Sequence, residues 1–126
     1  MKKSMLSILL IALSISSFAQ DARISNQTET DLNYKVTFVE LGSVRCIPCQ
    51  QMQPVMKAIE EKYPDQVKVV FYDVWTPEGK PWATTYKINV IPTQVFLDAE
   101  GKEFFRHEGF FPEEEIVKIL KTKGVE

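Results

Sequence analysis

The protein has 126 residues and a formal net charge of −2, and 44% of its residues are hydrophobic. This length and composition suit one domain with a single core. Acidic residues slightly outnumber basic ones, which argues against binding to nucleic acid or to an anionic membrane. Two cysteines are too few for a scaffold held together by disulfides, so we expect them to serve chemistry.

Residues 1–19 have the pattern of an export signal. Two lysines precede an apolar run from Met5 to Ile15, and the small residues Ser17 and Ala19 follow it. The run is shorter than the roughly 20 residues that a membrane-spanning helix needs. We therefore expect a signal peptide cleaved after Ala19 and an exported, periplasmic protein.

The rest of the chain divides into a polar N-terminal segment, residues 20–33, and one domain, residues 34–126. Residues 34–41 are rich in β-branched and aromatic side chains and predict a buried strand. A turn leads to the cysteines, and apolar residues at helical spacing predict a helix over residues 49–62. Pro54 lies inside that helix and is expected to kink it.

The second half of the domain predicts two more strands, a hairpin and two helices. A nearly continuous apolar run over residues 67–74 is typical of a central strand. A loop and a short helix over about residues 82–87 come next, and Trp75 and Trp82 in this region are expected to pack on the core. Strands follow over residues 93–97 and 102–107, joined by a turn at Gly101. The last helix begins at Pro112.

Alternation of strands and helices, ending in a hairpin and a helix, predicts an α/β fold. Its central mixed sheet would carry helices on both faces.

Cys46-Ile47-Pro48-Cys49 is the most informative motif of the chain. Thiols this close can open and close a disulfide within one loop. The start of a helix stabilises a thiolate, so we expect Cys46 to attack a partner's disulfide and Cys49 to resolve the mixed disulfide. Copper binding by both thiolates and an inert pair remain alternatives. Zinc lacks ligands, because only His107 could join the two cysteines.

Three features together resemble the thioredoxin superfamily over about residues 34–123. They are the cysteine motif after an apolar strand, Pro54 in the following helix, and Ile91-Pro92-Thr93, which is similar to the family's cis-proline loop. The resemblance implies a thioredoxin-like fold, with a central mixed β-sheet flanked by helices.

The resemblance also implies roles for residues around the cysteines. Glu40 would be a buried acid that carries the proton of Cys49. The main chain of Ile91 would bind an extended substrate, and Pro92 would form the wall beside Cys46. Phe71 stands where the family often has a lysine partner for the buried acid. The residues expected to bind substrate are Ile91, Pro92, Arg45, Ile47 and Pro48.

Arg45 replaces the tryptophan common before the first cysteine, and its charge would favour a Cys46 thiolate. His107 is far in sequence from the cysteines and is expected to be a structural or surface residue.

The function implied is an exported thiol–disulfide oxidoreductase that reduces protein disulfides. Its redox centre is the Cys46–Cys49 disulfide itself, with no other cofactor and no metal. Partners would be protein disulfides or dithiols and a membrane thiol-electron transporter that recharges the pair; we expect a monomer that binds no nucleic acid. A reductant is favoured because no histidine lies between the cysteines. The alternatives are a disulfide-forming oxidase or isomerase of the same fold and a non-enzymatic copper chaperone.

Overall fold

The computed structural model describes residues 33–126 of the chain. The expected signal peptide and almost all of the expected polar segment lie outside the described residues.

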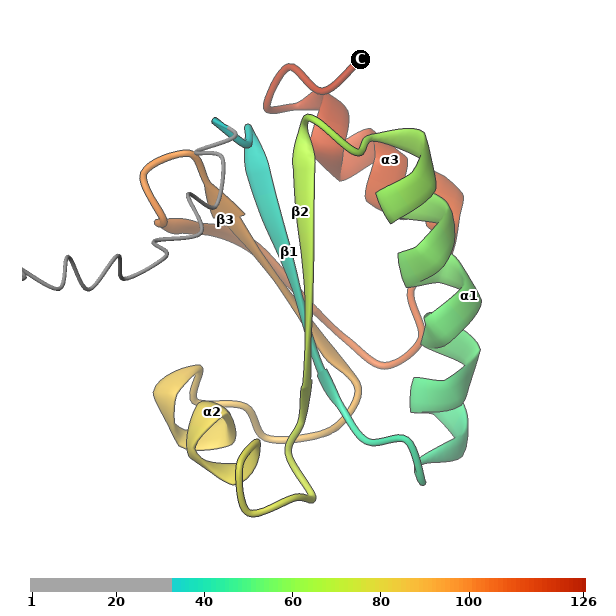
Figure 1. The fold of residues 1–126 in the computed structure, drawn as a ribbon, viewed down its shortest axis with the longest axis vertical. Coiled ribbons are helices and arrows are strands. Elements are labelled where there is room, and N and C mark those ends of the chain that lie inside the picture. The colour runs from blue at the N-terminus through green and yellow to red at the C-terminus, as the bar shows by residue number, and fades with distance from the viewer. Residues whose placement is uncertain (1–32) are drawn as a thin grey trace, which may run out of the picture.

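Four strands form one mixed sheet in the order β2-β1-β3-β4 (Figure 1). Strand β1 is parallel to β2 and antiparallel to β3, and β3 is antiparallel to β4. The predicted α/β fold with a central mixed sheet is confirmed. The strands are β1 (Val36–Gly42), β2 (Val67–Asp73), β3 (Thr93–Asp98) and β4 (Glu103–Glu108).

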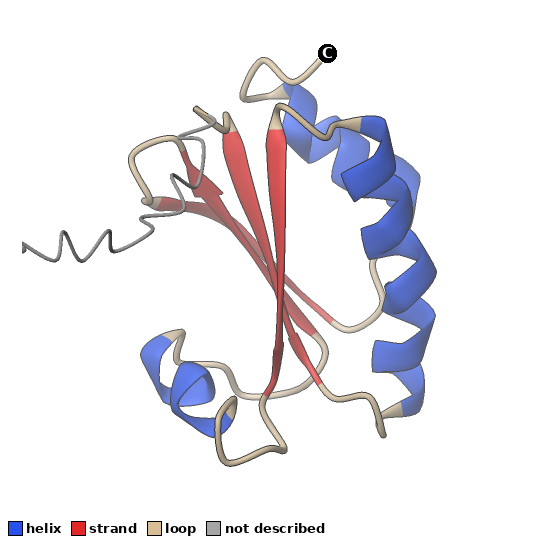
Figure 2. Ribbon diagram, in the orientation of Figure 1, coloured by secondary structure: helices blue, strands red, loops and turns tan. Residues whose placement is uncertain are grey.

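Helices cover both faces of the sheet (Figure 2). The helices α1 (Ile47–Lys62) and α3 (Glu113–Lys121) lie on one face, and the short α2 (Lys80–Thr85) lies on the other. Successive side chains of a strand point to opposite faces, so β1 supplies two cores. Val36 and Phe38 pack beneath α1 and α3, whereas Val39 and Leu41 pack on the side of α2.

Two helices begin earlier than the sequence pattern predicts. Helix α1 begins at Ile47, directly after Cys46, and α2 begins at Lys80. In each case a proline, Pro48 or Pro81, lies in the first turn, where a missing N–H costs no intrahelical hydrogen bond. Apolar periodicity does not register such solvent-facing first turns, which explains the difference.

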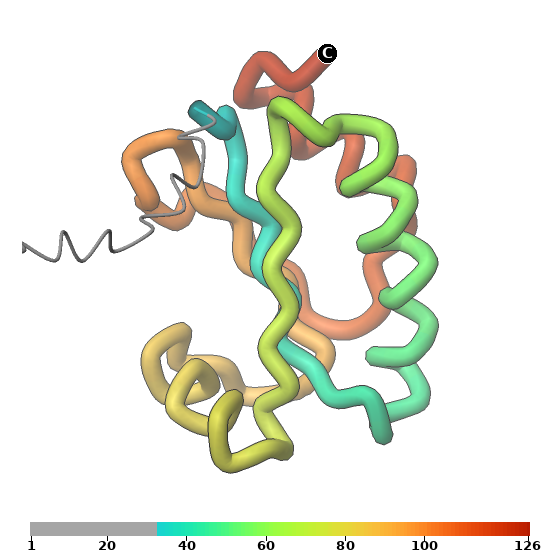
Figure 3. The backbone as a smooth tube through the Cα atoms, in the orientation of Figure 1, coloured from blue at the N-terminus to red at the C-terminus, as the bar shows by residue number. Residues whose placement is uncertain are grey.

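The last residues of the chain are tied to the sheet at the end where β1 and β2 begin (Figure 3). The Lys35 Nζ donates to the carbonyl oxygen of Gly124 at 2.6 Å, and the Gln66 Nε2 donates to that of Glu126 at 2.7 Å. The opposite end of the sheet carries the cysteines. Within residues 33–126, no helix has both the length and the apolar character that crossing a membrane would require.

Candidate active site

Cys46 and Cys49 are joined by a disulfide bond between the end of β1 and the start of α1. Their Cα atoms are 5.1 Å apart. Cys46 keeps 8% of its surface exposed, whereas Cys49 is fully buried, and Ile47 and Pro48 between them are exposed. Of the two sulfur-bearing residues, only Cys46 can therefore be reached from outside without rearrangement.

Cys46 is the residue that caps the start of α1. Its backbone is extended, and its carbonyl oxygen accepts the N–H of Gln50 at 2.9 Å. The first turn of α1 contains no acidic residue. Cys46 thus lies at the positive end of the helix dipole, where the first N–H groups of a helix lack intrahelical partners, an environment that favours a thiolate once the disulfide is reduced.

Gly42, at the end of β1, allows the strand to approach Cys49 closely. A Cβ atom at this position would lie 3.2 Å from the Cβ and Sγ of Cys49 and 3.5 Å from the Phe71 ring. Few such contacts are this tight in proteins, so a larger residue would displace the cysteine. The sequence pattern predicts a strand over residues 34–41 with a turn after it and does not reveal this contact, because the contact depends on how α1 packs.

Glu40 is fully buried in β1, two residues before Gly42 and therefore on the same face of the strand. Its Oε1 accepts a hydrogen bond from the Gln94 Nε2 at 3.4 Å, and its Oε2 has no hydrogen-bond partner among the described residues. Burial raises the pKa of Glu40 to about 8, although the hydrogen bond from Gln94 opposes the rise. The expected burial of this acid is confirmed.

Phe71 is the neighbour of Glu40 on β2. An apolar ring therefore faces Glu40 from β2, and this neighbour brings no positive charge to the carboxylate.

The Ile91–Pro92 peptide bond is cis, as the motif predicted. The Pro92 carbonyl oxygen accepts the N–H of Gly109 at 2.8 Å, and the Thr93 hydroxyl donates to the carbonyl oxygen of Val90 at 2.7 Å. Thr93 pairs with Leu41 of β1. This pairing brings the cis-proline loop to the end of the sheet that carries the cysteines.

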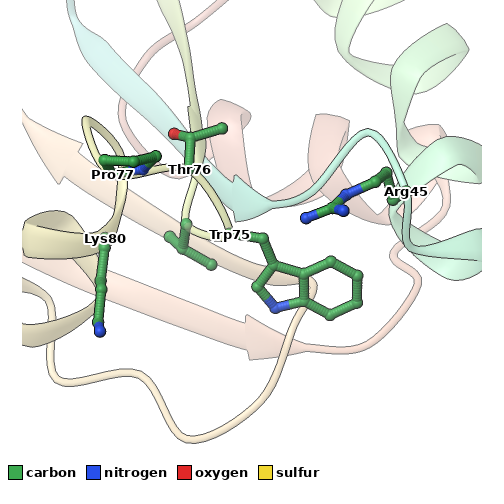
Figure 4. A pocket seen from close by; sticks show the side chains of 6 residues that line it. Arg45, Trp75, Thr76, Pro77 and Lys80 are labelled. Atoms are coloured by element: carbon green, nitrogen blue, oxygen red, sulfur yellow. The ribbon is translucent and has the colours of Figure 1, made fainter.

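Arg45 lies beside a cavity of about 570 Å³, which Figure 4 shows. Its guanidinium carbon is 5.9 Å from the centre of the Trp75 ring, within reach of a cation–π contact. Lys80 lines the same cavity from the start of α2. A second cavity, of about 420 Å³, shares Trp75 and Lys80 and is bordered by Ile91.

The expectation that both tryptophans pack on the core is wrong for Trp75, which is half exposed between the two cavities. Trp82 is partly exposed and stacks on Tyr72, with ring centres 4.3 Å apart. Trp75 lies two residues after the end of β2, in the loop, whereas Val74 directly after the strand is buried.

Asp73 fixes the loops on both sides of this cavity. Its carboxylate accepts the backbone N–H of Val44 at 3.2 Å and that of Trp75 at 3.0 Å. Burial acts to raise the pKa of Asp73, but these two hydrogen bonds, a third from the Ser43 side chain and the charge of Arg45 together lower it. Sequence analysis did not single out Asp73, although an acid at the end of a strand is a common partner for loop N–H groups.

Exposed apolar side chains gather in or next to the loops at this end of the molecule. A single exposed hydrophobic side chain is common on protein surfaces and carries little information. A group of them beside one site indicates a contact surface. The group comprises Val44, Ile47, Trp75, Val90 and Phe110.

In the described part of the chain, no three His, Cys, Asp or Glu side chains gather in a way that could hold a metal ion. His107 is half-buried on β4, and its Nδ1 lies 3.0 Å from the Gln94 Oε1. Because an amide oxygen only accepts hydrogen bonds, the Nδ1–H of His107 is the donor in this contact. Its structural role was expected, but its link to Glu40 through Gln94 was not.

The cysteine pair at the start of a helix, the cis-proline loop and the mixed sheet define a thioredoxin-like architecture. A family model described as "Thioredoxin-like domain" matches residues 22–124. The chain belongs to this family.

Similar proteins include the chloroplastic thioredoxin Y of Oryza sativa subsp. japonica, which is 30% identical over 70% of this chain and 51% of its own length. A thioredoxin-like protein of Synechocystis sp. is also 30% identical, over 70% of this chain and 81% of its own. The chain spans about half the length of the first curated relatives that it matches.

Solved thioredoxins share the fold. A chloroplastic thioredoxin z superposes with a TM-score of 0.63 at 27% identity, over 73% of this chain and 80% of its own. A variant thioredoxin of Halobacterium salinarum NRC-1 gives 0.65 at 23% identity, over 76% and 80%. At the latter identity the likeness bears on the fold alone.

Proposed function

We propose that this protein is a thiol–disulfide oxidoreductase that reduces the disulfides of partner proteins. The observation that carries the proposal is the asymmetry of the cysteine pair. Cys46 reaches the surface at the start of α1, while Cys49 is fully buried behind it. The Cys46 sulfur can therefore meet a partner protein, whereas the Cys49 sulfur can meet only that of Cys46.

The reaction proceeds in two exchanges. The Cys46 thiolate attacks one sulfur of the partner's disulfide, which forms a mixed disulfide and releases the partner's other sulfur as a thiolate. Cys49, once deprotonated, attacks the Cys46 sulfur, forms the Cys46–Cys49 bond and releases the second partner thiolate. The partner gains two electrons, the cysteine pair loses two, and solvent protonates the released sulfurs.

Glu40 is the base for the second exchange. Cys49 is fully buried, so its proton cannot pass directly to solvent and needs an acceptor inside the protein. A carboxyl whose pKa is about 8 changes protonation near the pH at which thiols ionise. It can take the proton from Cys49 during resolution and return it when the disulfide is reduced again.

The substrate lies across the loops that surround Cys46. The main chain of Ile91 pairs with an extended segment of the partner, and Pro92 forms the wall of the site. Arg45, Ile47 and Pro48 contact the partner around the attacking sulfur. Support for this surface comes from the exposed apolar residues and from the two cavities on either side of Trp75.

The protein acts after export, in the periplasm, as a monomer, and a membrane thiol-electron transporter returns electrons to the pair. The support for export is the charge and hydrophobic pattern of residues 1–19. The support for a reductant is the absence of a histidine between Cys46 and Cys49.

Trapping tests the assignment of the two cysteines. The Cys49→Ser variant, expressed with its leader and recovered by cell fractionation, is expected to remain joined to its partner through Cys46. Cys46→Ser is the matched control and is expected to capture nothing. Capture by Cys46→Ser alone would reverse the roles of the two sulfurs.

Two measurements separate the reductant from the alternatives. A reduction potential of about −270 mV fits a reductant, whereas about −120 mV fits a disulfide-forming oxidant. Stoichiometric Cu(I) binding without reduction of insulin disulfides would contradict the proposed enzyme and favour a copper chaperone.

A further inference from the structure

Glu40, Gln94 and His107 form a polar row across three strands of the sheet. Strand pairing places Glu40 opposite Gln94, and Gln94 opposite His107. Paired residues point to the same face of a sheet, and here that face is the one beneath α1 and α3. The row therefore runs from the acid near Cys49 to the half-buried edge strand β4.

Side-chain hydrogen bonds connect the row without a gap. The His107 Nδ1 lies 3.0 Å from the Gln94 Oε1, and the Gln94 Nε2 lies 3.4 Å from the Glu40 Oε1. Gln94 is fully buried, so it has no alternative partner in water. The His107 ring stacks on Phe111, with centres 4.1 Å apart and planes 10° apart, and this contact holds the ring in place.

We propose that His107 is a positioning residue for Glu40, which it orients and tunes through the amide of Gln94. The proposal rests on the proposed role of Glu40 as the base for Cys49, and it adds a residue from an edge strand to that machinery.

The two ends of an amide explain how the effect travels. The Gln94 oxygen only accepts hydrogen bonds and its nitrogen only donates them. When the His107 Nδ1–H donates to the oxygen, the nitrogen must face Glu40, which favours the carboxylate. Without that donor, the amide can rotate and offer its oxygen to Glu40. An oxygen there accepts a hydrogen bond only from the protonated acid and so favours that form.

The other groups around Glu40 carry no competing charge in the oxidised protein. Phe71 faces it from β2 and Gln94 from β3, while the buried residues of α3 are the apolar Ile116 and Leu120. At the start of α1 the cysteines are joined and do not titrate. His107, on β4, is the remaining titratable member of the row.

The test measures the titration of Glu40 by ¹³C NMR in the oxidised full-length chain, with carboxyl-labelled glutamate. The Glu40→Gln spectrum assigns the signal. His107→Phe keeps a ring over Phe111 but removes the donor, and it is expected to raise the midpoint by about half a unit to one unit. His107→Asn restores a donor near the position of Nδ1 and is expected to return the midpoint toward that of the original protein.

Gln94→Leu breaks the row at its centre and gives the decisive comparison. It is expected to raise the Glu40 midpoint by itself, and adding His107→Phe to it should produce no further shift. The proposal would be overturned if His107→Phe left the Glu40 midpoint unchanged. It would also be overturned if His107→Phe shifted the midpoint equally in the original protein and in the Gln94→Leu variant. The unfolding free energy of each variant is measured as well. A general loss of stability would appear there, and His107→Asn would not be expected to restore the Glu40 midpoint if such a loss were the cause.

This readout needs no turnover and no partner protein. Failure of the trapping experiment would overturn the proposed function and leave the coupling of the row intact. Failure of the titration would remove His107 from the machinery and leave the cysteine chemistry standing.

Discussion

At the scale of single residues, Glu40 is the least expected side chain in the interior. It is fully buried, one of its oxygens has no hydrogen-bond partner among the described residues, and burial raises its pKa from 4.5 to about 8. A group of this kind costs stability whenever it is charged. Its presence two residues from the glycine that contacts Cys49 argues for a role in exchange.

The pH dependence of stability follows from this shift. Between pH 4.5 and about 8 the folded state holds a proton on Glu40 that the unfolded state has released. The unfolding free energy should therefore fall as pH rises through this range, by up to about 1.4 kcal/mol per unit, and level off above it. Urea unfolding of the oxidised protein at a series of pH values measures the fall.

Glu40→Gln should remove most of that slope and be the more stable protein above pH 8. The exposed substitution Glu60→Gln on α1 is the control and should leave the slope unchanged. Parallel curves for the original protein and Glu40→Gln would show that Glu40 titrates at an ordinary pH.

At the scale of elements, the first turn of α1 sets the reactivity of Cys46. The turn presents unpaired N–H groups, contains no acid, and is preceded by Arg45. The guanidinium is exposed and solvent screens it, so its effect on the thiolate is expected to be smaller than that of the helix itself.

Arg45→Gln should shift the ionisation of the reduced Cys46 thiol to higher pH, since it removes a nearby positive charge. The rate of alkylation of Cys46 as a function of pH measures this shift. Lys57→Gln removes a charge farther along α1 and should leave the profile in place. Equal shifts in both variants would mean that only net charge matters.

At the scale of the whole molecule, the proposed chemistry and the proposed partner surface share one end of the sheet. Arg45, which precedes Cys46 in the sequence, and Lys80 line the larger of the two cavities, and none of its lining residues is acidic. Exposed apolar side chains from separate loops surround the same end. A partner segment that combines an acidic residue with apolar ones matches this surface in both charge and hydrophobicity.

Lys80→Glu should lower kcat/KM for reduction of an acidic disulfide peptide by about tenfold at low salt, with a smaller loss at high salt. A basic peptide of the same length should be reduced at least as well as before. Lys57 is an exposed residue of α1 that does not line the cavity. Lys57→Glu changes the net charge by the same amount and is the control. Equal losses for both peptides would indicate damage to the fold instead of lost attraction.

The sequence predicted the fold and the redox pair well because both depend on local patterns. Apolar runs mark the strands. Pro48 lies in the first turn of the helix after the cysteines, Pro54 lies inside that helix, and Pro92 marks the cis-proline loop. Gln94 and His107 could not be found in this way. The contact of Gln94 with Glu40, 54 positions away, and that of His107 with Gln94, 13 positions away, both depend on strand register.

The exposure of Trp75 also escaped prediction, since hydrophobicity alone favours a buried tryptophan. Asp73 was missed because the two loop N–H groups that it binds come from separate segments.

The hydrogen bonds that Lys35 and Gln66 make to the last residues of the chain fix the position of the C-terminus, and with it the way in which the domain can be attached to a surface. Residue 35 and the C-terminus lie together at one end of β1, while Gly42 and the cysteines lie at the other, roughly 20 Å away along the strand. A tether at the C-terminus would thus attach the domain at the end of the sheet opposite Cys46, so that the reactive sulfur points away from the point of attachment. Immobilisation through that terminus should leave disulfide exchange at a surface unimpeded.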